Sequence, residues 1–210
     1  MKAFILDGYG SADRVRAGDV PDPELRENDV LVQIHAAGVN LLDSKIRTGE
    51  FKLILRYRLP LILGHDVAGV VVRVGSRVRR FKPGDEVYAR PADGRIGAFA
   101  EFIAIKEDDV AIKPKALSME EAASIPLVGL TAWQALIERA NLRKGQKVFI
   151  QAGSGGVGTF AIQLANTWAR RWRRRQARTT WIWSGASAPT SSSITSRTTS
   201  KKFSAATTWC

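Results

Sequence analysis

Three glycines limit what the second half of this chain can fold into more than any other feature. Gly153, Gly155 and Gly158 form a G-x-G-x-x-G pattern that directly follows Lys147–Gln151, which has the pattern of a short buried strand. The residues from Thr159 to Ala165 then have the pattern of a helix. Glycine lets the backbone turn tightly and approach a pyrophosphate, and a helix N-terminus offers free amides. The pattern therefore predicts a dinucleotide-binding loop in an α/β domain, and a glycine-rich turn without a ligand is the alternative.

The residues before this loop have a different pattern. Short, largely apolar stretches alternate with Gly- and Pro-rich turns, and we expect strands at 2–6, 30–34, 67–74, 86–89 and 99–105. This pattern predicts that residues 1–113 form a small β-barrel or sandwich. Helical features follow, with a capping box at Ser118–Glu121 and helical spacing of apolar residues over 129–141.

Charge divides the chain after Ala165. The 210 residues carry a net charge of +12, but residues 166–210 contain nine Lys and Arg, no Asp or Glu, and five of the six tryptophans. The remainder, with 23 basic and 20 acidic residues, has an ordinary balance. The overall basic charge is therefore no evidence that the folded part binds nucleic acid.

Other features exclude whole classes of protein. The single cysteine, Cys210, excludes an internal disulfide and a cysteine-based zinc site. No run of 18 apolar residues is present, so we expect no membrane-spanning helix. The first residues meet charge too soon for a signal peptide, and we expect a cytoplasmic protein.

Five segments, in order, resemble the medium-chain dehydrogenase/reductase superfamily, and the resemblance is strongest to its zinc-free NADPH:quinone oxidoreductase and enone reductase branch. These segments are Ala37–Asp43, Gly64–Val71, Phe81–Tyr88, Pro126–Trp133 and Gly153–Gly158. The resemblance covers nearly all of residues 1–165. It implies an α/β fold in which a GroES-like β-barrel catalytic domain, 1–120, precedes an incomplete Rossmann cofactor-binding domain that starts at 121–165.

The resemblance also implies a reaction, in which NADPH gives a hydride to a quinone or an α,β-unsaturated carbonyl without a metal. Zinc-dependent relatives carry a cysteine where this chain has Val39 and Asn40, so His65 lacks cysteine partners, and we expect it to be a buried, hydrogen-bonded histidine. By resemblance, Asn40 lies near the nicotinamide and Asp43 orients its neighbours. Lys45 or Tyr57 would stabilise the negative charge that develops on the substrate oxygen. For both of these residues a solvated loop position is the alternative.

Cofactor contacts are implied for Thr131 and for the loop residues Gly153, Ser154, Gly155, Gly156, Val157 and Gly158. A cap at the start of a helix is the alternative for Thr131. The residues about 20 positions beyond the loop are Arg173–Arg175, which favours NADP over NAD, but they belong to the anomalous segment and carry little weight.

Residues 166–210 depart from the family pattern. We interpret this Ser/Thr/Trp-rich segment as disordered or as translated out of frame from near codon 166, with the rest of the Rossmann sheet missing. The 210-residue chain is then expected to be inactive. The resemblance allows a homodimer for the full-length form, and the sequence leaves the oligomeric state open. The alternative is a non-catalytic remnant whose arginines and tryptophans, including Trp168, bind nucleic acid.

Overall fold

The computed structural model describes residues 1–143, 146–171 and 182–185. The chain separates into two compact units, Met1–Leu127 and Val128–Cys210. The boundary predicted after residue 120 falls inside the helix Met119–Ala123, because Ala122 and Ala123 pack on the sheet of the first unit around Ala68. This helix therefore belongs with the strands that precede it.

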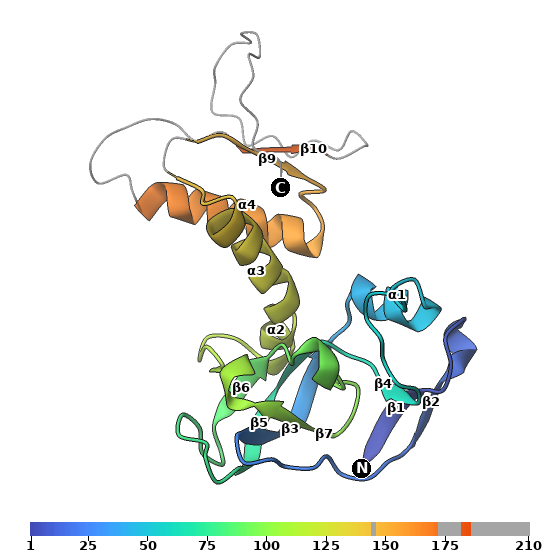
Figure 1. Cartoon of the computed structure of the whole chain (residues 1–210). Helices are drawn as coiled ribbons and strands as arrows, with labels where there is room; N and C mark the ends of the chain where they lie inside the picture. Colours follow the sequence, from blue (N-terminus) through green and yellow to red (C-terminus); the bar gives the residue numbers. More distant parts are fainter. Residues whose placement is uncertain (144–145, 172–181, 186–210) are drawn as a thin grey trace. The chain divides into compact units, whose positions relative to one another are not determined.

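The first unit is built mainly from strands (Figure 1). They are β1 (Lys2–Leu6), β2 (Val15–Asp19), β3 (Asp29–Gly38), β4 (Leu61–Ile62), β5 (Asp66–Val74), β6 (Glu86–Ala89), β7 (Phe102–Lys106) and β8 (Val110–Ile112). The helices are α1 (Leu41–Thr48) and α2 (Met119–Ala123), with 3-10 turns η1 (Ala12–Arg14), η2 (Asp93–Arg95) and η3 (Glu107–Asp109).

Two antiparallel sheets form from these strands. The larger sheet has the order β7-β3-β5-β6-β8, and the smaller has the order β2-β1-β4. An isolated bridge between Ala3 and Ala100 joins β1 to the segment that leads into β7. The long pairing of β3 with β5 sets Gly38, at the end of β3, opposite Asp66, at the start of β5. This register brings the beginning of α1 close to the beginning of β5.

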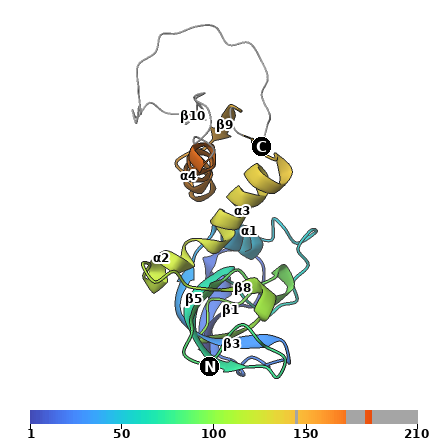
Figure 2. The ribbon, with the colours of Figure 1, turned by 90° about the vertical axis from the view of Figure 1, so that its left-hand side faces the viewer.

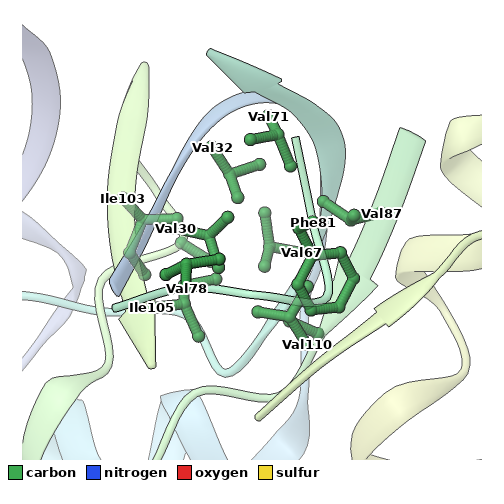
Figure 3. Close-up of a cluster of buried hydrophobic side chains, with 12 residues drawn as sticks. Val30, Val32, Val67, Val71, Val78, Phe81, Val87, Ile103, Ile105 and Val110 are labelled. Atoms are coloured by element: carbon green, nitrogen blue, oxygen red, sulfur yellow. The ribbon is translucent and has the colours of Figure 1, made fainter. Parts of the chain in front are cut away.

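The largest core cluster of the first unit is formed mainly by side chains from the strands of the larger sheet. Figure 3 shows Val30 and Val32 of β3 meeting Val67 and Val71 of β5, with the Phe81 ring beside them. The two β3 valines are fully buried. Full burial of one such side chain contributes about 1.5–3 kcal/mol, so this cluster contributes strongly to the stability of the unit.

The second unit begins in α3 (Pro126–Trp133), and the chain continues through a π-helical segment, η4 (Gln134–Arg139). The strand β9 (Val148–Gln151), the helix α4 (Gly156–Arg171) and the strand β10 (Ile182–Gly185) follow. Parallel pairing joins β10 to β9 (Figure 1), and α4 packs beside β9 (Figure 2). A small core forms from η4, β9 and α4, including Leu136, Ile150 and Ala161.

The predicted anomalous segment starts at residue 166, yet α4 continues without a break to Arg171. Trp168 packs edge to face on Trp133, with ring centroids 5.7 Å apart. Its ring is therefore part of this unit's packing, which differs from the base-stacking role of the nucleic-acid alternative. The other interpretations of the segment, including Arg173–Arg175, fall largely outside the described residues.

Candidate functional site

Two groups of predicted site residues can be described, one in each unit. The first surrounds the start of α1. Asn40 is the residue before the first turn of α1, and its backbone N–H donates to the Asp43 carboxylate, Oδ2, at 2.8 Å. The helix ends at Gly49, which adopts the left-handed conformation with φ of 85°. Local sequence thus determines both ends of the helix that carries Asp43 and Lys45.

A continuous hydrogen-bonded network links Asn40 to residues far along the chain. His65 Nδ1 lies 2.6 Å from Asp43 Oδ1, and Asn40 Nδ2 donates to Asp66 Oδ2 at 3.0 Å. The other oxygen of Asp66 accepts from the backbone N–H of Leu127, in the first turn of α3, at 2.8 Å. The network therefore joins the start of α1, the start of β5 and the start of α3.

The network is buried. Asp43, His65 and Asp66 are each at most 3% exposed. Burial raises the pKa of Asp66 to about 6, and the hydrogen bonds from Asn40 and Leu127 offset this only in part. The expectation that His65 is a buried, hydrogen-bonded histidine is confirmed. Asp66 is a member of the group that sequence reasoning missed, although a charged residue at the start of the apolar β5 was the available signal.

Two buried polar atoms of the first unit have no hydrogen-bond partner among the described residues. Among the described residues, Tyr57 Oη and His65 Nε2 are the buried side-chain nitrogen or oxygen atoms that make no hydrogen bond. Burial also raises the pKa of the Tyr57 phenol to about 12. Tyr57 is therefore a neutral hydroxyl over the whole physiological range and retains its proton for donation.

Lys45 lies in a different environment from Tyr57. Its ammonium is 3.4 Å from the Glu50 carboxylate and 5.8 Å from the centre of the Phe51 ring. The side chain is 39% exposed, so it is partly solvated and already has an anionic partner. The geometry connects Asn40 and Asp43 directly, and it does not connect Lys45 to their network.

The second group is the glycine loop between β9 and α4. A Cβ on Gly158 would lie 2.3 Å from the Ala152 carbonyl oxygen and 2.7 Å from Gly153 Cα, so only glycine allows the helix to approach the loop this closely. A Cβ on Gly155 would meet nothing nearer than 3.4 Å. Gly158 thus serves the packing of helix on loop, while Gly155 leaves space beside the backbone, as a pyrophosphate requires.

Ser154, Gly156 and Val157 complete this loop, and Val157 is 40% exposed at the first turn of α4. Thr131 lies in the middle of α3, five residues after Pro126. The alternative that it caps the start of a helix is therefore wrong, since that helix begins earlier than the sequence suggested. Its exposed position on α3 leaves the predicted cofactor contact untested.

Within the described ranges, no group of three or more His, Cys, Asp or Glu is placed to hold a metal ion. None of the described helices is long and apolar enough to cross a membrane.

Comparison with known proteins places these features in a family. Residues 26–115 match the alcohol dehydrogenase GroES-like domain. The chain is 44% identical over 172 residues to a 2-methylene-furan-3-one reductase of Solanum lycopersicum, covering 79% of this chain and 44% of the relative. It is 40% identical over 172 residues to a chloroplastic NADPH-dependent alkenal/one oxidoreductase of Arabidopsis thaliana, with the same coverage of both chains.

A solved structure agrees with both units. The quinone oxidoreductase from Coxiella burnetii matches with a TM-score of 0.78 and 36% identity, over 89% of this chain and 56% of that one. The chain spans about half the length of the curated relatives that it matches. The first unit is the GroES-like domain, and the second has the strand, glycine loop, helix and parallel strand of a Rossmann domain. In both units the chain is therefore similar to quinone and enone oxidoreductases of the medium-chain dehydrogenase/reductase superfamily, and residues 26–115 match its GroES-like domain.

Proposed function

We propose that this chain is part of an NADPH-dependent oxidoreductase that transfers a hydride to a quinone or an α,β-unsaturated carbonyl. The observation that carries the proposal is the sequence identity of this chain, 40% or more, to two relatives. The names of both relatives specify reduction of an enone-type substrate. One of those names also specifies NADPH. The preference for NADP that Arg173–Arg175 suggested concerns residues outside the described part.

The glycine loop supports the cofactor part of the proposal. The space beside Gly155 and the start of α4 at Gly156 suit a pyrophosphate, which would accept hydrogen bonds from backbone amides of Gly153–Gly158. Thr131 is a further proposed contact. When bound, NADPH supplies the hydride, and the protein supplies position and electrostatics.

In the first unit, we assign each residue a role from its surroundings. Asn40 lies near the nicotinamide in this proposal, and Asp43 orients it through the hydrogen bond to its backbone. Tyr57 is a better candidate than Lys45 to donate to the developing oxyanion, since its hydroxyl is neutral and unpartnered within the described residues. Lys45 would first have to leave Glu50.

The 210-residue chain on its own is proposed to have little or no activity. The described part of its second unit contains a sheet of two strands packed on α4, and the chain spans about half the length of the curated relatives. A homodimeric full-length form and a cytoplasmic location stay predictions, and one similar relative is chloroplastic. Binding of nucleic acid is not expected, and no observation on the described residues favours it.

The test is a fluorescence titration of the purified chain with NADPH, followed by assays of NADPH oxidation with a quinone and with an enone. We expect saturable NADPH binding and little turnover. Saturable binding that disappears in Gly155→Asp, where a side chain and a negative charge would occupy the open space, supports the proposal. A chain that is folded by circular dichroism yet shows no NADPH binding contradicts it. Measurable turnover contradicts the predicted inactivity.

A further inference from the structure

We infer that His65 is a positioning residue that holds Asn40 in place through the Asp43 carboxylate. The importance of this for the reaction rests on the proposed function, whereas the structural part stands without it. The starting observation is that His65 is fully buried, with one ring nitrogen on Asp43 and the other without a partner in the described residues.

The Asp43 carboxylate divides its two oxygens between two donors. Oδ1 is 2.6 Å from His65 Nδ1, and Oδ2 accepts the backbone N–H of Asn40 at 2.8 Å. The other oxygen of Asp43 accepts the Asn40 N–H, and His65 Nε2 has no partner in the described residues to which it could donate, so we place the proton between His65 and Asp43 on Nδ1. This assigns the Nδ1–H tautomer to the His65 ring.

Because Asp43 is 3% exposed, water cannot replace a donor that is lost. Without the His65 N–H, the carboxylate would keep only the bond to Asn40, and a buried charge with too few donors turns toward whatever donor it can reach. The position of Oδ2, and with it the backbone N–H of Asn40, therefore depends on His65.

The side chain of Asn40 is held from the other side. Its Nδ2 donates to Asp66 Oδ2 at 3.0 Å. At pH values above its pKa of about 6, Asp66 is ionised and determines which way the amide faces, because only the NH2 group can donate. Asn40 thus has its backbone oriented by Asp43 and its amide oriented by Asp66, so that the amide Oδ1 is turned away from Asp66. Displacement of the backbone at Asn40 would move this acceptor as well.

Three substitutions separate this role from general support of the fold. In His65→Asn, the amide nitrogen occupies nearly the place of Nδ1, so the donor to Asp43 is retained. In His65→Gln, the amide nitrogen reaches the place of Nε2, and the donor to Asp43 is lost. In His65→Leu both nitrogens are lost while much of the apolar volume is kept.

The first measurement is nuclear magnetic resonance of the 210-residue chain, with the backbone and side-chain amide signals of Asn40 as the readout. We expect His65→Asn to keep these signals near their wild-type positions, and His65→Gln and His65→Leu to shift them and accelerate their exchange with water. Equal shifts in the Asn and Gln variants would overturn the inference.

The wild-type chain provides a test that needs no variant to fold. The ring nitrogens of His65 should show the Nδ1–H tautomer, with a proton protected from exchange. His35, which is exposed on β3, provides the unprotected reference in the same spectrum. An Nε2–H tautomer at His65 would overturn the inference by itself.

The second measurement is NADPH affinity in a double-mutant cycle with Asn40→Ala. We expect His65→Leu to weaken binding by up to about tenfold, comparable to the net contribution of one hydrogen bond. If His65 acts through Asn40, the double variant binds no more weakly than Asn40→Ala alone. If the affinity losses of the two single variants add up in the double variant, His65 does not act on binding through Asn40. If the wild-type chain does not bind NADPH, the proposed function fails, and the resonance experiments still decide the role of His65.

Discussion

Replacing Asp66 by asparagine should change how the stability of this chain depends on pH. Burial raises the pKa of Asp66 to about 6 from an ordinary value of 3.8, so the folded state prefers the protonated acid. A group with a raised pKa contributes stability that is complete below its unfolded pKa and is lost as pH rises through its folded pKa. Two pKa units at about 1.4 kcal/mol each amount to a loss of about 3 kcal/mol between pH of about 4 and 7.

Asparagine keeps the shape of the side chain and an oxygen that can accept the Leu127 N–H, but it cannot ionise. The wild-type chain should therefore lose stability relative to Asp66→Asn as pH rises, by about 3 kcal/mol across that window. The assay is urea unfolding at a series of pH values, followed by far-ultraviolet circular dichroism. Taking the difference between the two proteins cancels the titration of carboxylates that share no partner with Asp66, because such sites contribute additively. Asp43, which shares Asn40 with Asp66, is the exception.

The control is Asp19→Asn. Asp19 is 78% exposed, and its side chain pairs with Lys2 on the surface of the β1–β2 pair. The difference in unfolding free energy between Asp19→Asn and the wild-type chain should change little with pH, since exposed ion pairs contribute little to stability. If the Asp66→Asn and wild-type curves run parallel between pH of about 4 and 7, Asp66 is not held in the environment described above, and the reasoning from burial is refuted.

Three further substitutions test other parts of the structure. Asp29→Ala removes a carboxylate, 2% exposed, that accepts two hydrogen bonds from the Arg95 guanidinium at 2.8 and 2.6 Å, and thermal unfolding should show a loss of about 3 kcal/mol because the partner charge is left unpaired. A loss under about 1 kcal/mol would mean that water solvates Arg95 adequately. Tyr57→Phe removes a hydroxyl without a partner in the described residues, so urea unfolding should show unchanged or greater stability, whereas a clear loss would reveal a hidden hydrogen bond. Gly158→Ala should destabilise the second unit and abolish NADPH binding, because backbone atoms at 2.3 and 2.7 Å cannot move aside, while Gly155→Ala should fold normally; equal stability of the two variants in urea would contradict the close packing at Gly158.

Local pattern was sufficient for much of the fold. The strand at β9, the glycine loop and the helix after it are recognisable from neighbouring residues, because backbone freedom and apolar spacing act over a few positions. The alternation of apolar residues in β3 and the largely apolar, β-branched run in β5 predicted their strands for the same reason. The ends of elements were less well determined: α3 begins at Pro126 and gives way to a π-helical segment, and α4 extends past residue 165. Packing within the second unit, including Trp168 on Trp133, accounts for that extension.

In the candidate site, too, the sequence predicted some features and the packed structure decided others. Sequence and resemblance singled out Asn40 and Asp43, and the spacing of three residues between them is the spacing of a helix cap. What the sequence by itself did not reveal is that His65 and Asp66 are the partners of these residues, or that Leu127 completes the network. Those contacts depend on the antiparallel register of β3 and β5, which sets Gly38 opposite Asp66. Hydrogen-bond partners and buried pKa values are properties of the packed structure, since desolvation and distance exist only once remote segments have come together.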